Sequence, residues 1–230
     1  MKMSQDQIQE LFQFTRKHFV EHYDLQTELV DHLANGIEEQ MALQPKLTFK
    51  EALNLEFKKF GVFGFHEVIK EKTNAMHKRY WKIFFRFYKD YFKLPKVLML
   101  FGISTLLFFV FRIIPDEIGK YIPGIAVMLV LVFFLFVTFR NKRKRKTKTR
   151  KWLLEDMIAT NGNIFLVLNF ALQILISPNL IEWPLESPLG SFMVSFGVVL
   201  LFLLFHVMVN VIPPKAEELL VETYPEYKMN

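Results

Sequence analysis

The 230-residue sequence contains no cysteine. A chain without thiols forms no disulfides, carries out no thiolate catalysis and has no Cys-ligated zinc site. Its first ten residues, MKMSQDQIQE, have neither an apolar core nor a small-residue cleavage site, so they are not expected to act as a secretory signal peptide. We therefore expect the N-terminus to stay in the cytosol.

Apolar residues are abundant. They make up 52% of the chain, including 26 Phe, which is more apolar surface than a soluble domain of ordinary composition buries. The formal net charge is +6, but the Lys and Arg residues cluster beside apolar runs, as in the cytoplasmic loops of membrane proteins. We therefore expect an integral membrane protein that contacts anionic lipid headgroups and has no nucleic-acid partner.

The apolar runs predict four membrane spans. Their ranges are 97–114, 121–139, 157–176 and 189–212. Between the second and third lies the run RNKRKRKTKTRK at 140–151, with nine basic residues and no acidic one, so this loop should remain cytosolic. Trp152, Leu153 and Leu154 are expected at the membrane interface. Both ends are then cytosolic, with a tail at 213–230.

Residues 1–75 predict a cytosolic module of three to four helices. Ser4 with Gln7, and Thr48 with Glu51, match capping boxes. A second helix with Asp24 as its N-cap should bury one apolar stripe. That stripe consists of Leu25, Leu29, Leu33, Ile37 and Met41. A last helix from about Phe65 to Leu94 should end at Pro95, and its basic, aromatic part at 76–96 lies next to the membrane. The predicted fold class is all-α.

Part of the module resembles a known family. The run YDLQTELVDHLANGIEEQ at 23–40, followed by TFKEAL at 48–53 and FKKFG at 57–61, is similar to the HAAS signalling domain, which precedes membrane helices in bacteria. Members of that family are often encoded near PadR-type regulators. The resemblance implies a signalling or partner-binding role in the bacterial cytoplasmic membrane, and it brings no catalytic residues.

We accordingly predict a non-enzymatic signalling or adaptor protein whose module binds a protein partner or a second copy of the chain. The predicted partner surface is acidic and opposes the stripe of the second helix. It comprises Glu28, Asp31, Glu38 and Glu39. The predicted contacts to anionic lipid are basic residues next to the membrane. They are Lys78, Arg79, Lys82, Arg86, Lys89, Lys93, Arg143 and Arg145.

Polar residues within the spans leave an alternative open. They are Asn169 and Gln173 in the third span and Ser191, Ser195, His206 and Asn210 in the fourth. Such groups turn inward and hydrogen-bond across helices, which favours bundle packing. The alternative is a polar path with a titratable His206, which would make the protein a subunit of a small transporter or channel.

Two groups of residues match catalytic motifs but are not expected to be catalytic. His18, Glu21 and His22 match the inverted zinc-peptidase pattern HxxEH, but a small helical module is a poor host for a third ligand and a peptide cleft. Ser104 and His206 supply the residue types of a serine protease dyad and nothing else of one. We therefore expect no enzyme activity, no metal and no cofactor.

Overall fold

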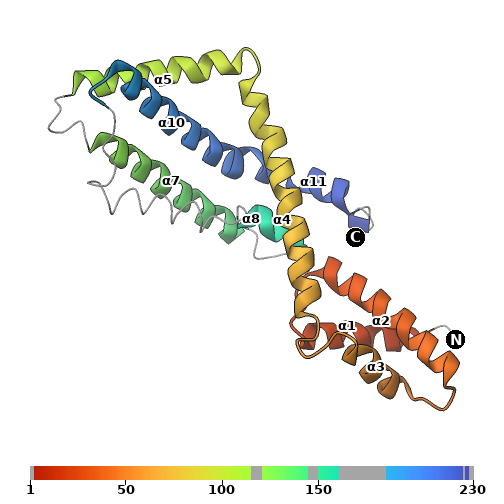
Figure 1. The fold of residues 1–230 in the computed structure, drawn as a ribbon. Coiled ribbons are helices and arrows are strands. Elements are labelled where there is room, and N and C mark those ends of the chain that lie inside the picture. The colour runs from red at the N-terminus through yellow and green to blue at the C-terminus, as the bar shows by residue number, and fades with distance from the viewer. Residues whose placement is uncertain (1–2, 115–120, 145–149, 161–184, 225, 228–230) are drawn as a thin grey trace. The chain divides into compact units, whose positions relative to one another are not determined.

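The computed structural model describes residues 3–114, 121–144, 150–160, 185–224 and 226–227. Every regular element among these residues is helical, and the described ranges contain no strand, which confirms the all-α prediction. The chain divides into two compact units (Figure 1). The first is Met1–Arg79 with Lys148–Asp156, and the second is Tyr80–Thr147 with Met157–Asn230.

The first unit is built on four helices. They are α1 (Gln5–Lys17), α2 (Tyr23–Leu43), α3 (Phe49–Lys58) and the start of α4 (His66–Lys89), which passes into the second unit after Arg79. Both predicted capping boxes are confirmed. Ser4 N donates to Gln7 Oε1 at 2.8 Å, and Thr48 N donates to Glu51 Oε2 at 2.9 Å. These local bonds fix where α1 and α3 begin.

The core of the first unit follows the predicted stripe of α2. Leu25, Leu29, Leu33 and Ile37 are all buried, and Leu33 and Ile37 have no exposed surface. Since large apolar side chains stabilise a fold by leaving water, this stripe anchors the unit.

Aromatic rings close one end of the first unit. The ring of Phe57, on α3, lies edge-on to Phe14 at 5.0 Å and tilted against His18 at 4.4 Å. Phe65, before α4, lies 5.0 Å from Phe57. In the turn that follows α1, Phe19 has a φ of 63°, and 87% of its surface is accessible. A bulky residue in this left-handed conformation is unusual.

The α1–α2 connection corrects one prediction. The N-cap of α2 is His22, so Asp24, predicted as the cap, lies in the first helical turn. Gln26 holds this connection instead, because its buried side chain donates to Val20 O at 2.6 Å and accepts from Arg16 Nε at 3.3 Å. The carboxylate of Asp24 is thereby left to bond elsewhere in the unit.

Gly36 lets α3 approach α2 closely. A Cβ at this position would lie 2.4 Å from the carboxyl carbon of Glu56, which is only 2% exposed. Glu56 Oε1 accepts hydrogen bonds from Lys59 Nζ at 2.5 Å and from Gln40 Nε2 at 3.3 Å. Gly36 therefore provides the space for a buried, hydrogen-bonded carboxylate between the two helices.

The predicted helix from Phe65 to Leu94 is shorter in the structure. Helix α4 ends at Lys89 and is followed by a single 3₁₀ turn, η1 (Asp90–Phe92). The next helix, α5, begins at Lys96, directly after Pro95. Proline disfavours helical backbone in the residue before it and has no N–H of its own, so it separates the two helices.

The second unit holds the apolar helices. It contains α5 (Lys96–Ile113), α7 (Ile122–Lys144), α10 (Pro188–His206), the π-helical turn η2 (Val207–Val211), the 3₁₀ turn η3 (Pro213–Lys215) and α11 (Ala216–Thr223). Within the described residues, three helical stretches are long and apolar enough to cross a membrane. They are Lys96–Ile113, Ile122–Arg140 and Pro188–Thr223, the last including the turns up to α11. They correspond to the predicted spans 97–114, 121–139 and 189–212. Most of the predicted span 157–176 lies outside the described residues.

Helices α5 and α10 pack antiparallel. Phe101 lies 5.5 Å from Phe196, and Phe108, two turns further along α5, lies 6.3 Å from Phe192. Ser104 and Ser195 are fully buried, and small residues of this kind let helix backbones approach in a membrane.

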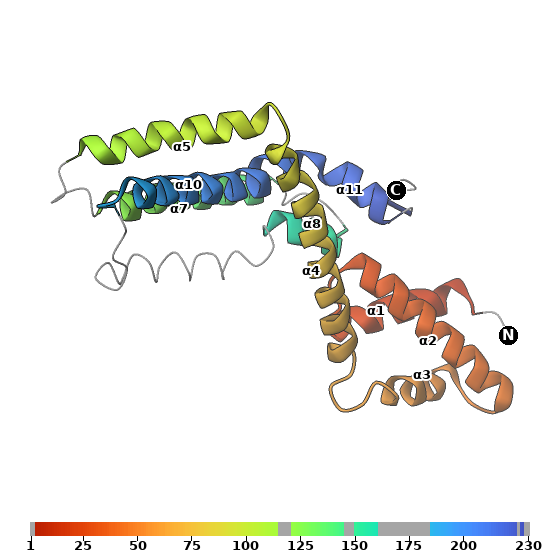
Figure 2. The ribbon, with the colours of Figure 1, turned by 45° about the horizontal axis from the view of Figure 1, so that its top comes forward.

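Helix α7 lies on α10 in the same direction, as Figures 1 and 2 both show. Phe134, in the second half of α7, lies 4.5 Å from Phe205 near the end of α10. The three helices thus form one apolar layer in which α5 runs opposite to α7 and α10. At the far end of α5, Arg112 Nη1 donates to Glu186 O at 3.4 Å, just before α10 begins.

Candidate functional site

The most distinctive feature of the first unit is the segment Arg150–Asp156, which we call the docked segment. It begins with the last two residues of the basic run 140–151, yet it packs against the beginning of α2. The indole of Trp152 meets the ring of Tyr23 edge-on at 5.3 Å, and Trp152 is only 4% exposed. Leu153 and Leu154 are buried as well, and the short helix α8 (Leu153–Ala159) begins here.

Main-chain bonds fix the docked segment in place. Tyr23 N donates to Lys151 O at 2.8 Å, which satisfies one of the free N–H groups at the start of α2. In return Leu153 N donates to Asp24 Oδ1 at 3.2 Å, so Asp24 stabilises the start of α8 rather than capping α2. Each of the two helix starts therefore receives an acceptor from the other segment.

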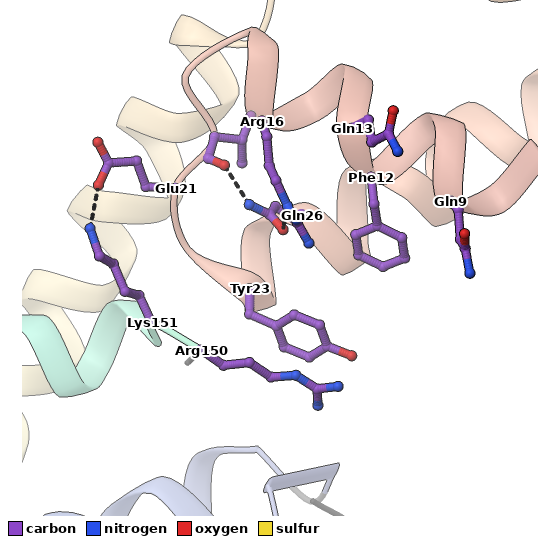
Figure 3. A pocket seen from close by; sticks show the side chains of 10 residues that line it. Gln9, Phe12, Gln13, Arg16, Glu21, Tyr23, Gln26, Arg150 and Lys151 are labelled. Atoms are coloured by element: carbon purple, nitrogen blue, oxygen red, sulfur yellow. Dashed lines mark hydrogen bonds and ion pairs between the residues drawn. The ribbon is translucent and has the colours of Figure 1, made fainter. Parts of the chain in front are cut away.

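Ion pairs frame these contacts. Lys151 Nζ donates to Glu21 Oε2 at 2.9 Å (Figure 3). This hydrogen bond and the charge of Lys151 lower the pKa of Glu21, and Glu21 in turn raises the pKa of Lys151. On the other side, His22 Nε2 lies 3.0 Å from Asp156 Oδ2. Because these groups are largely exposed, the pairs add specificity to the docking more than stability.

This packing corrects the prediction that Trp152, Leu153 and Leu154 lie at the membrane interface. Their apolar side chains are buried in protein instead, within the same unit as α1 and α2.

An open pocket of about 740 Å³ lies where the docked segment meets α1 and α2. Helix α1 contributes Arg16, Phe12 and two glutamines, and the docked segment contributes Arg150 and Lys151. The guanidinium of Arg150 lies over the Tyr23 ring at 4.5 Å, as Figure 3 shows. Sequence reasoning missed this pocket because its two walls come from distant parts of the chain.

The predicted acidic partner surface is partly engaged inside the first unit. Glu28 pairs with Lys72 of α4, and Glu38 Oε1 accepts from Met3 N at 2.8 Å. Asp31 and Glu39 are exposed on α2. Glu28 stays exposed beside Lys72, so it is accessible together with Asp31 and Glu39.

The six predicted lipid contacts on and after α4 have exposed side chains. They are Lys78, Arg79, Lys82, Arg86, Lys89 and Lys93. Arg86 donates two bonds of 3.3 Å to Glu222 on α11. Lys93 Nζ donates to Asp90 Oδ1 at 2.6 Å, which lowers the pKa of Asp90. Arg143 lies within α7, and Arg145 falls outside the described residues.

The polar residues of α10 use their hydrogen bonds locally. Ser195 Oγ donates to Ser191 O at 2.8 Å, and Ser191 Oγ donates to Leu185 O at 2.6 Å. His206 Nδ1 lies 3.4 Å from Asn210 Nδ2, at the π-helical turn η2. The cavity beside this pair measures about 10 Å³ and is otherwise lined by apolar side chains. The predicted residues Asn169 and Gln173 lie outside the described residues.

The two catalytic motifs do not have catalytic geometry. His18 caps the end of α1, where its Nδ1 lies 2.8 Å from Phe14 O, whereas His22 begins α2 and contacts Asp156. The HxxEH residues therefore do not share a helix face, and the described residues contain no cluster of three metal-binding side chains.

The pair Ser104 and His206 lacks catalytic geometry for a different reason. Ser104 Oγ donates to Leu100 O at 2.8 Å within its own helix. The antiparallel register of α5 and α10 sets Ser104 near the middle of α10, about 17 Å along the helix from His206.

No protein-family model matches the chain, and no curated protein or solved structure shows significant similarity to it. The fold and the apolar helices define a helical membrane protein.

Proposed function

We propose that this protein is a non-enzymatic signalling adaptor in a bacterial cytoplasmic membrane. Its N-terminal module binds a partner, and the docked segment conveys the module's state to the membrane helices. The observation that carries the proposal is the pairing of Tyr23 with Trp152 and the bonds around it. A passive tether needs one covalent link through α4, whereas this module also holds the loop that follows α7.

Four membrane crossings fit this arrangement. Helices α7 and α10 run in the same direction, so the chain between them has to return from one end of the layer to the other. The remaining crossing is proposed within 157–176, where the sequence has a further apolar run, and it would leave both chain termini in the cytosol.

The resemblance of 23–61 to the HAAS domain supports a signalling role for the module. Its partner surface is proposed on α2, where Asp31 and Glu39 are exposed. A basic surface on the partner complements these carboxylates and speeds encounter.

Crosslinking in native membranes tests the proposal. A photoreactive residue at Asn35, exposed on α2 between Asp31 and Glu39, should capture one defined protein. Capture should be lost in Asp31→Lys/Glu39→Lys and kept in the control Lys46→Glu/Lys50→Glu, which also changes two exposed charges on the module. Recovery of only the protein itself, or capture unaffected by the Asp31 and Glu39 changes, contradicts the adaptor function.

The same assay separates the adaptor from the transporter or channel. His206→Leu/Asn210→Leu removes the paired polar groups at the end of α10 and in η2 without touching the module. Partner capture should remain unchanged in this variant. A protein that conducts through these groups would instead lose ion or solute flux in proteoliposomes while wild type shows it.

A further inference from the structure

The open pocket between α1 and the docked segment carries a concentrated positive charge. Its lining holds three cationic side chains, Arg16, Arg150 and Lys151, against one carboxylate, Glu21. Lys151 already engages that carboxylate at 2.9 Å. The formal charges of the lining residues sum to +2, which favours an anionic ligand.

The two arginines are organised around one pair of aromatic rings. Arg150 lies over the ring of Tyr23 at 4.5 Å, and Tyr23 is parallel to Phe12 with 6.2 Å between centroids. Arg16 lies one helical turn beyond Phe12 on the same face of α1, and its Nε is held by Gln26 at 3.3 Å. A guanidinium fixed in this way is preoriented, so binding an anion orders little that is still free.

We propose that this pocket binds a phosphate-bearing group, with Arg16 from α1 and Arg150 from the docked segment as its ligands. Guanidinium groups bind phosphate oxygens through paired, charge-assisted hydrogen bonds. Gln9 and Gln13 on α1 add neutral donors at the rim of the pocket. A dianionic phosphate monoester matches the charge of the lining better than a carboxylate does.

Such a ligand bridges the module and the docked segment. Because Arg16 and Arg150 belong to different walls, a phosphate between them stabilises the docked arrangement over the undocked one. The phosphate-bearing group would be a ligand of the proposed adaptor. Phosphate binding itself does not depend on the adaptor function, and only the interpretation of docking as a signal rests on it. The phosphate belongs either to a soluble compound or to a lipid headgroup, since only five residues separate Arg150 from the end of α7 at Lys144.

Trp152 provides the measurement. The chain has three tryptophans, and Trp81→Phe/Trp183→Phe leaves Trp152 as the sole one, beside Tyr23. The full chain in nanodiscs of zwitterionic lipid is titrated with inorganic phosphate and pyrophosphate, with chloride at matched ionic strength as the blank. A second set of nanodiscs contains phosphatidic acid. We expect a saturable change in Trp152 emission with the soluble anions if the source is soluble, and only with phosphatidic acid if it is a lipid.

Variants identify the site. Arg16→Gln should weaken binding about tenfold or more, because it removes a paired charge-assisted contact. Lys17→Gln, an exposed cation on the same helix outside the lining, should bind as wild type. Gln13→Glu adds a negative charge to the lining without removing a docking contact, and it should also weaken binding.

The proposal is overturned if no titration saturates in either set of nanodiscs, or if Arg16→Gln and Lys17→Gln weaken binding equally. Phosphate binding without any crosslinked partner would leave this inference standing and remove the adaptor function. A captured partner without phosphate binding would support the adaptor function and overturn this inference.

Discussion

Tyr23 and Trp152 are 129 positions apart in the chain, and their rings meet edge-on at 5.3 Å with 66° between the ring planes. An edge-to-face contact of two large rings contributes about 0.5–1.5 kcal/mol beyond the burial of their area. The main-chain bond from Tyr23 N to Lys151 O lies directly beside it. This contact links the helical module to the loop between apolar helices.

Replacing Trp152 with Ala should release the docked segment. Truncating a buried tryptophan costs about 3–5 kcal/mol, which exceeds what the exposed ion pairs contribute. The Leu153 amide, bonded to Asp24, should then exchange its hydrogen at least about a hundredfold faster. Hydrogen exchange with mass spectrometry measures this, with Trp81→Phe as the control. Unchanged exchange in Trp152→Ala would show that the indole does not hold the segment.

The pKa of Glu21 should depend on Lys151. In the folded protein this pKa lies below its ordinary value because Lys151 donates to the carboxylate. The pair therefore stabilises docking above the ordinary pKa of a glutamate, and that contribution is lost as the pH falls through the lowered one. In Lys151→Gln the pKa of Glu21 should rise toward normal, while Lys151→Arg should keep it low. Carboxyl NMR titration decides, and equal values in wild type and Lys151→Gln would exclude the pair in solution.

Gly36→Ala should destabilise the first unit by about 1–3 kcal/mol, although alanine favours a helix by about 1 kcal/mol. The added Cβ collides with the buried carboxyl of Glu56, which Lys59 and Gln40 hold in place. In a Glu56→Ala background the obstacle is gone, so the same substitution should stabilise by about 0.5–1 kcal/mol. Thermal melts of all four variants form a double-mutant cycle. Equal effects of Gly36→Ala in both backgrounds would contradict the close approach.

The proposed four-crossing topology predicts opposite labelling of two engineered cysteines. The chain has no native cysteine, so each single substitution reports alone. Ser187→Cys, at the N-cap of α10, should react with an impermeant thiol reagent on intact cells. Thr147→Cys, in the basic run, should react only after the cells are opened. Labelling of both residues from the same side would require an even number of crossings between them.

Local features of this protein follow from its sequence. The capping boxes at Ser4 and Thr48 and the buried stripe from Leu25 to Ile37 depend on residues within one or a few helical turns. The apolar helices can also be predicted from local sequence, because their length and hydropathy alone indicate that they can cross a membrane. Pro95, which separates α4 from α5, is a local signal too, although the helix before it ends five residues earlier than its pattern predicts.

Only the tertiary structure decided where Trp152, Leu153 and Leu154 are buried. Beside a basic run, these apolar residues have the same local pattern whether they face lipid headgroups or protein, and a pattern carries no information about a partner 129 positions away. The local pattern is equally uninformative for Asp24. Its carboxylate is suited to cap a helix, but in the structure it accepts a hydrogen bond from Leu153 N of the docked segment. The pocket between Arg16 and Arg150 exists for the same reason, because its walls meet only when long-range packing brings them together.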